Sequence, residues 1–246
     1  SAEFEFHLFN SKNTYKLVLT QAPARAVDVL VDPNFKAFML AEFDKDHSGD
    51  FSAEELAAPG KVRYSEYDDS REGLAASGAV SSFAGLELFT GITEFYFNSP
   101  VYATEGPKTK CTFTEIDFSG NKKLESIQVT SPVLQSINLA NLPSLEKINV
   151  ASDTALHVLN TSGCPALKAI MGYASGIESV DLSKNTKLEQ VTLSGTKVKK
   201  YDFSNNPELN NIFIGSESLE SVVFKNNTKV SSLMISCLKN VKQKPD

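Results

Sequence analysis

The sequence predicts a right-handed solenoid of about seven mostly β coils, each about 21 residues long, behind a small α+β region. A phrase with apolar residues at positions 1, 4 and 6 returns every ten or eleven residues, and alternate phrases lie 21 or 22 residues apart. Units of this size cannot bury an apolar face alone, so they stack on one another. The phrases begin at Phe113, Leu124, Leu134, Leu145, Leu156, Leu167, Ile177, Leu188, Val198, Leu209, Leu219 and Val230.

Within one phrase, such as residues 177–182, apolar and polar positions alternate, which is typical of a half-buried strand. The odd phrases follow the leucine-rich-repeat pattern L-x-x-L-x-L-x-x-N/C in five of six coils, and this places the chain in the α/β-horseshoe class. Their ninth positions are Asn121, Leu142, Cys164, Asn185, Asn206 and Asn227. The even phrases, such as residues 188–193, are too short for a proper helix, so we expect a flat solenoid with a sheet on either side.

The chain divides into an N-terminal region, residues 1–80, and a repeat domain, residues 81–246. Residues 92–97 form an earlier phrase 21 residues before Phe113, and the apolar stretch at 83–89 is expected to cap the open end of the solenoid. Upstream, two alternating stretches around a turn at 10–13 predict a β-hairpin.

Residues 44–55, DKDHSGDFSAEE, match the EF-hand loop at every diagnostic position. Gly49 permits the sharp turn, Asp50 offers its backbone carbonyl, and Glu55 closes the shell with both carboxylate oxygens. Asp32-Pro33 and Pro59-Gly60 delimit a helix-loop-helix around it. The predicted Ca²⁺ ligands are Asp44, Asp46, Ser48, Asp50, Ser52 and Glu55.

An alternative reading needs no metal, because Ser52-x-x-Glu55 is also a capping box. Both roles can hold together. The second EF-hand that usually pairs with the first is missing, since the candidate beginning at Asp68 ends in Ala79 where a glutamate is needed. A lone site suits a weak structural calcium better than a switch.

Solvent-facing residues of the odd strands are expected to form columns because the coils stack in register. Stacked carboxylates and amides can hold sugar hydroxyls or a cation, or can simply keep an exposed sheet soluble. Few aromatic residues are exposed there, and the chain has no Trp for stacking on sugars. The candidate partner face comprises Glu115, Asp117, Gln135, Asn138, Asn160, Glu178, Asp181, Lys200, Asp202 and Glu220.

Charge and composition exclude several partners. The net charge of −6 lies entirely in residues 1–80, and the repeat region is neutral, so nucleic acid and anionic membranes are not expected partners. No apolar run is long enough to span a bilayer. The three cysteines lack metal spacing, so we expect buried, unpaired side chains at Cys111, Cys164 and Cys237.

The order of parts resembles leucine-rich-repeat proteins of Bacteroides-type gut bacteria over about residues 32–240. The likeness rests on NFKAFMLAEFDKDHSGDFSAEEL, VSSFAGLELFTGITEF and repeats such as VDLSKNTKLEQVTLSGTKV. It implies a secreted or lipid-anchored surface protein with a binding role, and it carries the calcium loop over at the six residues above. Segments such as MGYASG and IGSES depart from the regular second half-repeat of that group.

We therefore expect a non-enzymatic, monomeric binding protein outside the cytoplasm, with a protein or glycan as ligand and a lipid anchor upstream of Ser1 as an option. The alternatives are a non-catalytic arm of an enzyme and a calcium-stabilised adhesin scaffold. The histidines His7, His47 and His157 lie far apart, and no nucleophile elbow, phosphate loop or zinc cluster occurs.

Overall fold

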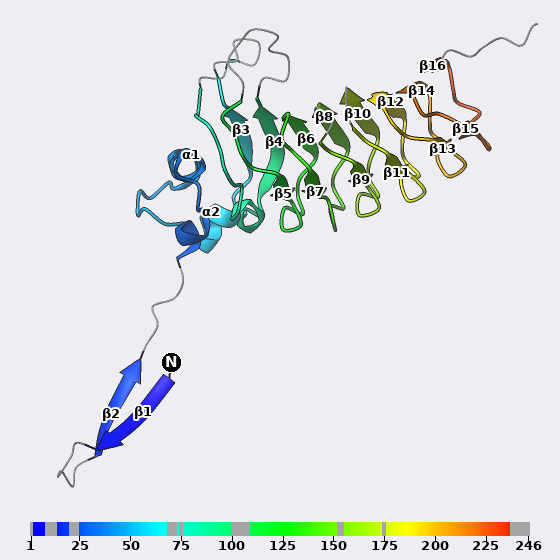
Figure 1. Ribbon diagram of the computed structural model, residues 1–246. Coiled ribbons are helices and arrows are strands. Elements are labelled where there is room, and N and C mark those ends of the chain that lie inside the picture. The colour runs from blue at the N-terminus through cyan, green and yellow to red at the C-terminus, as the bar shows by residue number, and fades with distance from the viewer. Residues whose placement is uncertain are drawn as a thin grey trace, which may run out of the picture.

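The chain is a parallel β-solenoid preceded by two short helices (Figure 1). The computed structural model describes residues 2–7, 14–19, 25–67, 73, 76–99, 109–151, 155–173 and 176–236. An antiparallel pair, β1 (Ala2–His7) and β2 (Thr14–Leu19), confirms the N-terminal hairpin. The leucine-rich-repeat fold class predicted from the sequence is confirmed.

One long side of the solenoid is an eight-stranded parallel sheet, built mainly from the even phrases. Apolar positions 4 and 6 of these phrases, such as Ile127 and Val129, point inward and are buried, except in the last phrase, where Leu233 and Ile235 are exposed. The strand order is β16-β14-β12-β10-β8-β6-β4-β3. The strands are β3 (Gly60–Ser65), β4 (Ile92–Asn98), β6 (Ser126–Thr130), β8 (Lys147–Ala151), β10 (Ala169–Tyr173), β12 (Gln190–Thr196), β14 (Asn211–Ser216) and β16 (Ser232–Ser236).

The opposite side, from the odd phrases, carries strands of only three residues, and we call its outward surface the short-strand face. These strands form the separate parallel pairs β5-β7, β9-β11 and β13-β15. They are β5 (Glu115–Asp117), β7 (Ser136–Asn138), β9 (Val158–Asn160), β11 (Ser179–Asp181), β13 (Lys200–Asp202) and β15 (Ser221–Val223). The expectation of a sheet on either side therefore holds, but the wide sheet lies on the side without the Asn/Cys motif.

Turn chemistry explains the shortness of these strands. The side chain of Asp117 accepts a hydrogen bond from the backbone N–H of Ser119 at 2.8 Å, and Asp181 accepts one from Ser183 at 2.9 Å. Such Asx turns bend the chain immediately after the strand. Equivalent bonds follow β7, β9 and β13. The even phrases form no such turn and continue as longer strands: all but one lack Asp or Asn at this position, and the side-chain oxygen of the exception, Asn149, accepts no hydrogen bond.

A ladder of buried asparagines links successive coils, as the ninth-position pattern predicts. The Asn185 side-chain amide donates to the backbone carbonyls of Thr161 and Cys164, at 3.0 and 2.9 Å, in the preceding coil. Asn206 and Asn227 repeat this arrangement, and Asn121 donates to the carbonyls of Leu86 and Phe89. Each amide thus gives a second donor to carbonyls that already accept one backbone N–H in the turn of the neighbouring coil, and so ties the two coils together.

Two cysteines behave as small buried residues. Cys164 occupies an Asn position of the ladder, and its thiol lies 3.5 Å from the carbonyl oxygen of Leu139. Burial raises the pKa of the Cys111 and Cys164 thiols to about 12. Both are free, which confirms the expectation for these two, while Cys237 lies outside the described residues.

An aromatic cluster closes the N-terminal end of the core through residues 82–89, which we call the cap segment. The ring of Phe83 lies 4.9 Å from that of Phe35 and 4.8 Å from that of Phe113. The cap segment contains the short helix η2 (Leu86–Leu88). At Gly120, a β carbon would lie 1.9 Å from the carbonyl oxygen of Glu87, so only glycine allows the first coil to approach the cap this closely. The cap segment thus packs directly on the first coil.

Within the N-terminal region, residues 25–67 pack on the solenoid. Its helices are α1 (Pro33–Phe43) and α2 (Ala53–Ala57), with a 3-10 turn η1 (Ala26–Val29) before them. Strand β3 is the edge strand of the large sheet, and one apolar core runs continuously from Val27 to Ile214. The domain boundary placed at residue 80 stays a prediction. No helix in the described part of the chain is long and apolar enough to cross a membrane.

The ladder predicts a large loss of stability for Asn185→Ala. This change removes three hydrogen bonds of a buried side chain, two to carbonyls and one from the Thr161 hydroxyl, so we expect a loss of about 2–4 kcal/mol in the free energy of unfolding. Urea denaturation measures it. The control Asn211→Ala, at an exposed strand position, should cost less than about 0.5 kcal/mol. Equal losses for the two variants would contradict a structural role for the ladder.

Candidate functional site

The predicted calcium loop connects α1 to α2 and has the internal hydrogen bonds of a closed turn. The Asp44 carboxylate accepts from the backbone N–H groups of Ser48 and Gly49, at 3.0 and 2.9 Å. Asp46 accepts from Ser48 N–H at 2.9 Å. Gly49 has φ +77°, the left-handed conformation that the motif requires of its glycine.

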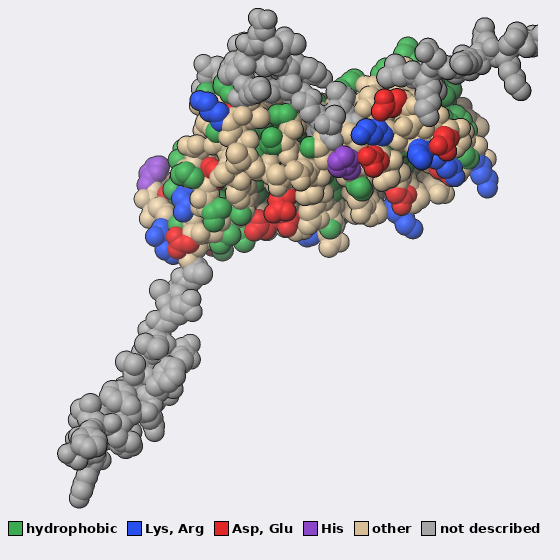
Figure 2. Space-filling model, in the orientation of Figure 1, with side chains coloured by type: hydrophobic (Ala, Val, Ile, Leu, Met, Phe, Trp, Pro, Cys, Tyr) green, Lys and Arg blue, Asp and Glu red, His purple; other side chains and the backbone are tan. Residues whose placement is uncertain are grey.

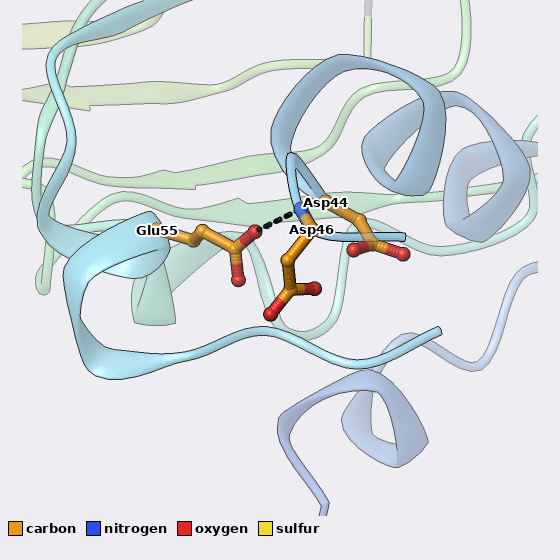
Figure 3. A group of neighbouring side chains, drawn as sticks. All are labelled: Asp44, Asp46 and Glu55. Carbon is orange, nitrogen blue, oxygen red and sulfur yellow. Dashed lines mark hydrogen bonds between the residues drawn. The ribbon is translucent and has the colours of Figure 1, made fainter. Parts of the chain in front are cut away.

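Three of the six predicted ligands come together as a carboxylate group (Figure 3). One carboxylate oxygen each from Asp44, Asp46 and Glu55 lies within 4.8 Å of the others. Hard cations such as Ca²⁺ take oxygen ligands of this kind. Asp44 and Asp46 come from the start of the loop, and Glu55 comes from α2 at its end (Figure 3). A cation placed between the three carboxylates would neutralise their mutual repulsion.

Glu55 already has four donors within the protein. One carboxylate oxygen accepts from the N–H groups of Lys45 and Asp46, at 2.6 and 3.4 Å, and the other from Ser52 N–H and hydroxyl, at 2.8 and 2.9 Å. The N–H of Ser52, followed by its hydroxyl and the N–H of Lys45, lowers the pKa of Glu55 to about 2. The carboxylate is therefore ionised at neutral pH, as a calcium ligand must be.

The capping box is present in full. Ser52 accepts from Glu55 N–H at 3.2 Å while the Glu55 carboxylate accepts from Ser52 N–H. The N-terminal turn of α2 is thus stabilised without any metal. Capping uses about two of the four lone-pair directions of the Glu55 carboxylate and the N–H groups of Lys45 and Asp46 use the others, so a bound cation would replace some of these donors.

The remaining predicted ligands differ in their roles. The Ser48 hydroxyl donates to the backbone carbonyl of Asp50 at 3.3 Å. The Asp50 carboxylate turns away, accepts from Val27 N–H at 2.9 Å, and lies 3.6 Å from the Arg25 guanidinium. This agrees with the expectation that Asp50 offers its carbonyl and not its side chain.

Arg25 is a loop contact that the sequence analysis missed. Its guanidinium also donates to the carbonyl oxygen of Gly49, so the segment before α1 holds the loop from outside. Nothing in the motif indicates a partner 24 residues upstream. On the other side, the rings of Phe51 and Phe89 lie 4.8 Å apart, so the loop packs directly on the cap segment. The second EF-hand candidate, beginning at Asp68, lies largely outside the described residues.

All ten residues of the candidate partner face are exposed and lie on the short-strand side. The strand register confirms the central column: Asp117 faces Asn138, Asn160 faces Asp181, and Asp202 faces Val223. The other five, however, fall into two columns. Glu115 and Lys200 share one, and the column beside it contains Gln135, Glu178 and Glu220.

The central column has a structural use that the sequence analysis did not assign. An oxygen of each Asp or Asn side chain accepts the N–H that forms the turn after its strand, and the Asn138 amide also donates to Asp117 at 2.9 Å. Hydrogen bonds from Ser183 lower the pKa of Asp181, and those from Ser204 do the same for Asp202. The outer columns carry exposed ion pairs, His157 with Glu178 at 3.3 Å and Lys199 with Glu220 at 3.9 Å.

Fold and site together define a leucine-rich-repeat-type parallel β-solenoid with an acidic helix-loop-helix at its capped end. No protein-family model and no curated protein matches the sequence.

Among solved structures, the chain is similar to InlP of Listeria monocytogenes, with 18% identity and a TM-score of 0.52 over 89% of this chain and 61% of that chain. This chain thus spans less than two thirds of the InlP chain. Two weaker likenesses are to the internalin InlF (15% identity, TM-score 0.30, 89% and 80% covered) and the functional domain of InlJ (13%, 0.24, 86% and 75%), both of L. monocytogenes. The structural neighbours are therefore Listeria internalins, and the likeness to InlP shows a shared fold.

The capping box predicts a cost for Ser52→Ala even in a calcium chelator. The loss of one N-cap acceptor should lower the free energy of unfolding by about 1 kcal/mol. Thermal or urea unfolding in excess EDTA measures it. Ser221→Ala, an exposed serine of β15, is the control and should change little. An Ser52→Ala variant as stable as this control in EDTA would show that the box does not act without metal.

Proposed function

We propose that the protein is a non-enzymatic binding module that acts outside the cytoplasm and holds a protein or a glycan on its short-strand face. The observation that carries this proposal is the geometry of that face, where ten predicted contact residues of mixed charge are exposed in register along the coils. Mixed-sign surfaces of this kind favour specificity in recognition. The fold shared with InlP is consistent with a protein-interaction scaffold.

The two alternatives that the sequence left open, a non-catalytic arm of an enzyme and a calcium-stabilised adhesin scaffold, stay proposals. Among described residues, one group of three or more potential metal ligands gathers, and it lies in the calcium loop. His157 pairs with Glu178 on the open face, and both side chains are more than half exposed. Surface display, and a lipid anchor as in the Bacteroides-type proteins, remain part of the proposal.

We further propose that the loop binds a single structural Ca²⁺ through Asp44, Asp46, Ser48, Asp50, Ser52 and Glu55. The support is the convergence of three carboxylates, the closed turn at Gly49, and an ionised Glu55. Because Phe51 packs on Phe89 of the cap segment, calcium at this loop would stabilise the end of the solenoid and not the partner face directly.

Calcium is expected to stabilise the fold, and the gain should depend on Asp44. With a dissociation constant near 1 mM, 10 mM Ca²⁺ would add about 1.4 kcal/mol and raise Tm by several degrees. Differential scanning calorimetry with and without Ca²⁺ measures this. Asp44→Ala should lose the increment, whereas Asp28→Ala, at an exposed acidic residue nearby, should retain it. An unchanged Tm for the parent chain on addition of Ca²⁺ would contradict the proposed calcium site.

Charge reversal on the short-strand face is expected to weaken partner binding. Glu178→Lys with Glu220→Lys changes two exposed positions in the same column, and we expect retention of a captured protein or arrayed glycan to fall about tenfold. The charge-matched control is Glu125→Lys with Glu189→Lys, two exposed residues just before large-sheet strands. Loss of binding in the control pair alone would assign recognition to the large sheet instead.

A further inference from the structure

A hollow of about 510 Å³ lies between the cap segment and the first two short strands. Its volume falls in the range of about 300–1,000 Å³ that is typical of ligand sites. Figure 2 shows acidic side chains gathered over this part of the molecule, where β5 and β7 lie in Figure 1. The polar lining residues include Ser82, Glu87, Glu115, Asp117, Ser136 and Asn138.

Three carboxylates from two separate parts of the chain face this hollow, and no Lys or Arg is among its lining residues. Glu87 and Asp117 each use one oxygen for a local backbone bond, to Gly85 N–H and Ser119 N–H. Among the described residues, the Glu115 carboxylate has no hydrogen bond or ion pair. The hollow is therefore negatively charged, and several of its acceptor oxygens have no protein donor.

The hollow also borders an unpaired strand edge. In the described part of the chain, β5 pairs with β7 on one side only, and its other side faces the cap segment across the hollow. The outward edge of a terminal strand presents backbone N–H and C=O groups, to which an extended peptide can add as a further strand.

A second hollow, of about 690 Å³, adjoins the first, since Glu115 and Ser136 line both. Its other lining residues are Thr114, Gln135, Ala155 and His157. The two hollows together form a polar groove from the cap segment across β5 and β7. A strand added to β5 would lie at the end of this groove beside the cap segment, and the remainder of the groove, which crosses the strands, would hold residues that follow it.

We propose that this groove binds an extended segment of a protein partner, which adds to the free edge of β5 and places a Lys or Arg side chain among Glu87, Glu115 and Asp117. The inference rests on the proposed binding function and selects its protein ligand over its glycan ligand. The feature of the partner that the groove would recognise is a cationic side chain on a β-strand.

Two other occupants fit the groove less well. The only ring in the lining of either hollow, apart from His157, is that of Phe83, which is 2% exposed, so the groove offers little surface for stacking a sugar. A metal ion needs carboxylate oxygens close together, and among the described residues such a group occurs at Asp44, Asp46 and Glu55, not here. Carboxylates spaced more widely can instead each accept from a different N–H of a guanidinium or contact an ammonium group.

The test is selection of a displayed library of random ten-residue peptides on the full chain. We expect enriched peptides with a Lys or Arg among alternating β-forming residues, and binding at least tenfold weaker to the Glu87→Gln, Glu115→Gln double variant. A peptide with Glu in place of the cation should lose binding similarly, and proline at neighbouring positions should remove it because proline cannot donate to a strand ladder. The control variant Glu125→Gln, Glu189→Gln should bind as the parent does.

Several outcomes would overturn the inference: no enrichment, enriched peptides without a cation, or equal binding to the double variant and its control. Glycan retention that depends on Glu87 and Glu115 would also overturn it, because the occupant would then be a sugar. Tm measurements verify that both double variants fold. Glu178 contacts His157 of the groove lining, so the single reversal Glu220→Lys tests the broader binding function away from this groove, and the failure of one proposal is distinguishable from failure of the other.

Discussion

Every coil of this protein depends on its neighbours to seal its interior. The leading residues of successive phrases, such as Leu134, Leu156 and Ile177, are completely buried, and the atoms that bury them belong largely to the coils on either side. The same dependence holds for polar groups, because Asn185 donates to carbonyls of the coil before it. Stability therefore requires strict register, and register aligns chemically similar side chains in columns along each face.

Register also limits which columns are free to recognise a partner. On the short-strand face, Asp117 and its equivalents are partly committed to the turns that end each strand. The side chains that remain free for recognition lie in the outer columns and at the N-terminal end of the solenoid, where the repeat stops. There the cap segment takes the place of a preceding coil without pairing with β5, and this mismatch creates the acidic groove. The proposed function and the proposed partner chemistry both follow from the interruption of the repeat.

Sequence periodicity predicted most of the fold because its signals are local or strictly repeated. The strands, the Asn ladder, the capping box at Ser52 and the cap around Phe83 all follow from spacing. The wide sheet was not assigned to the even phrases, because strand length depends on turn bonds such as that from Ser119 to Asp117. The Arg25 contact and the groove were not predictable, since each joins segments whose proximity is set only by packing across the cap. For the calcium loop, spacing predicted which carboxylates converge, and metal binding itself stays a proposal.

Deletion of one coil tests the central claim most directly. Removal of residues 177–197 joins one phrase to its equivalent and leaves Asn206 facing the carbonyls of Thr161 and Cys164 in place of those of Leu182 and Asn185. We predict that this chain, followed by circular dichroism and urea unfolding, keeps its β spectrum and one cooperative transition. Removal of half a coil, residues 177–187, places every later short strand on the large-sheet side and every later large-sheet strand on the short-strand side. It should therefore abolish both the β spectrum and the cooperative transition. If the two deletions behaved alike, the coils would not be equivalent units sealed by their neighbours, and the account would fail.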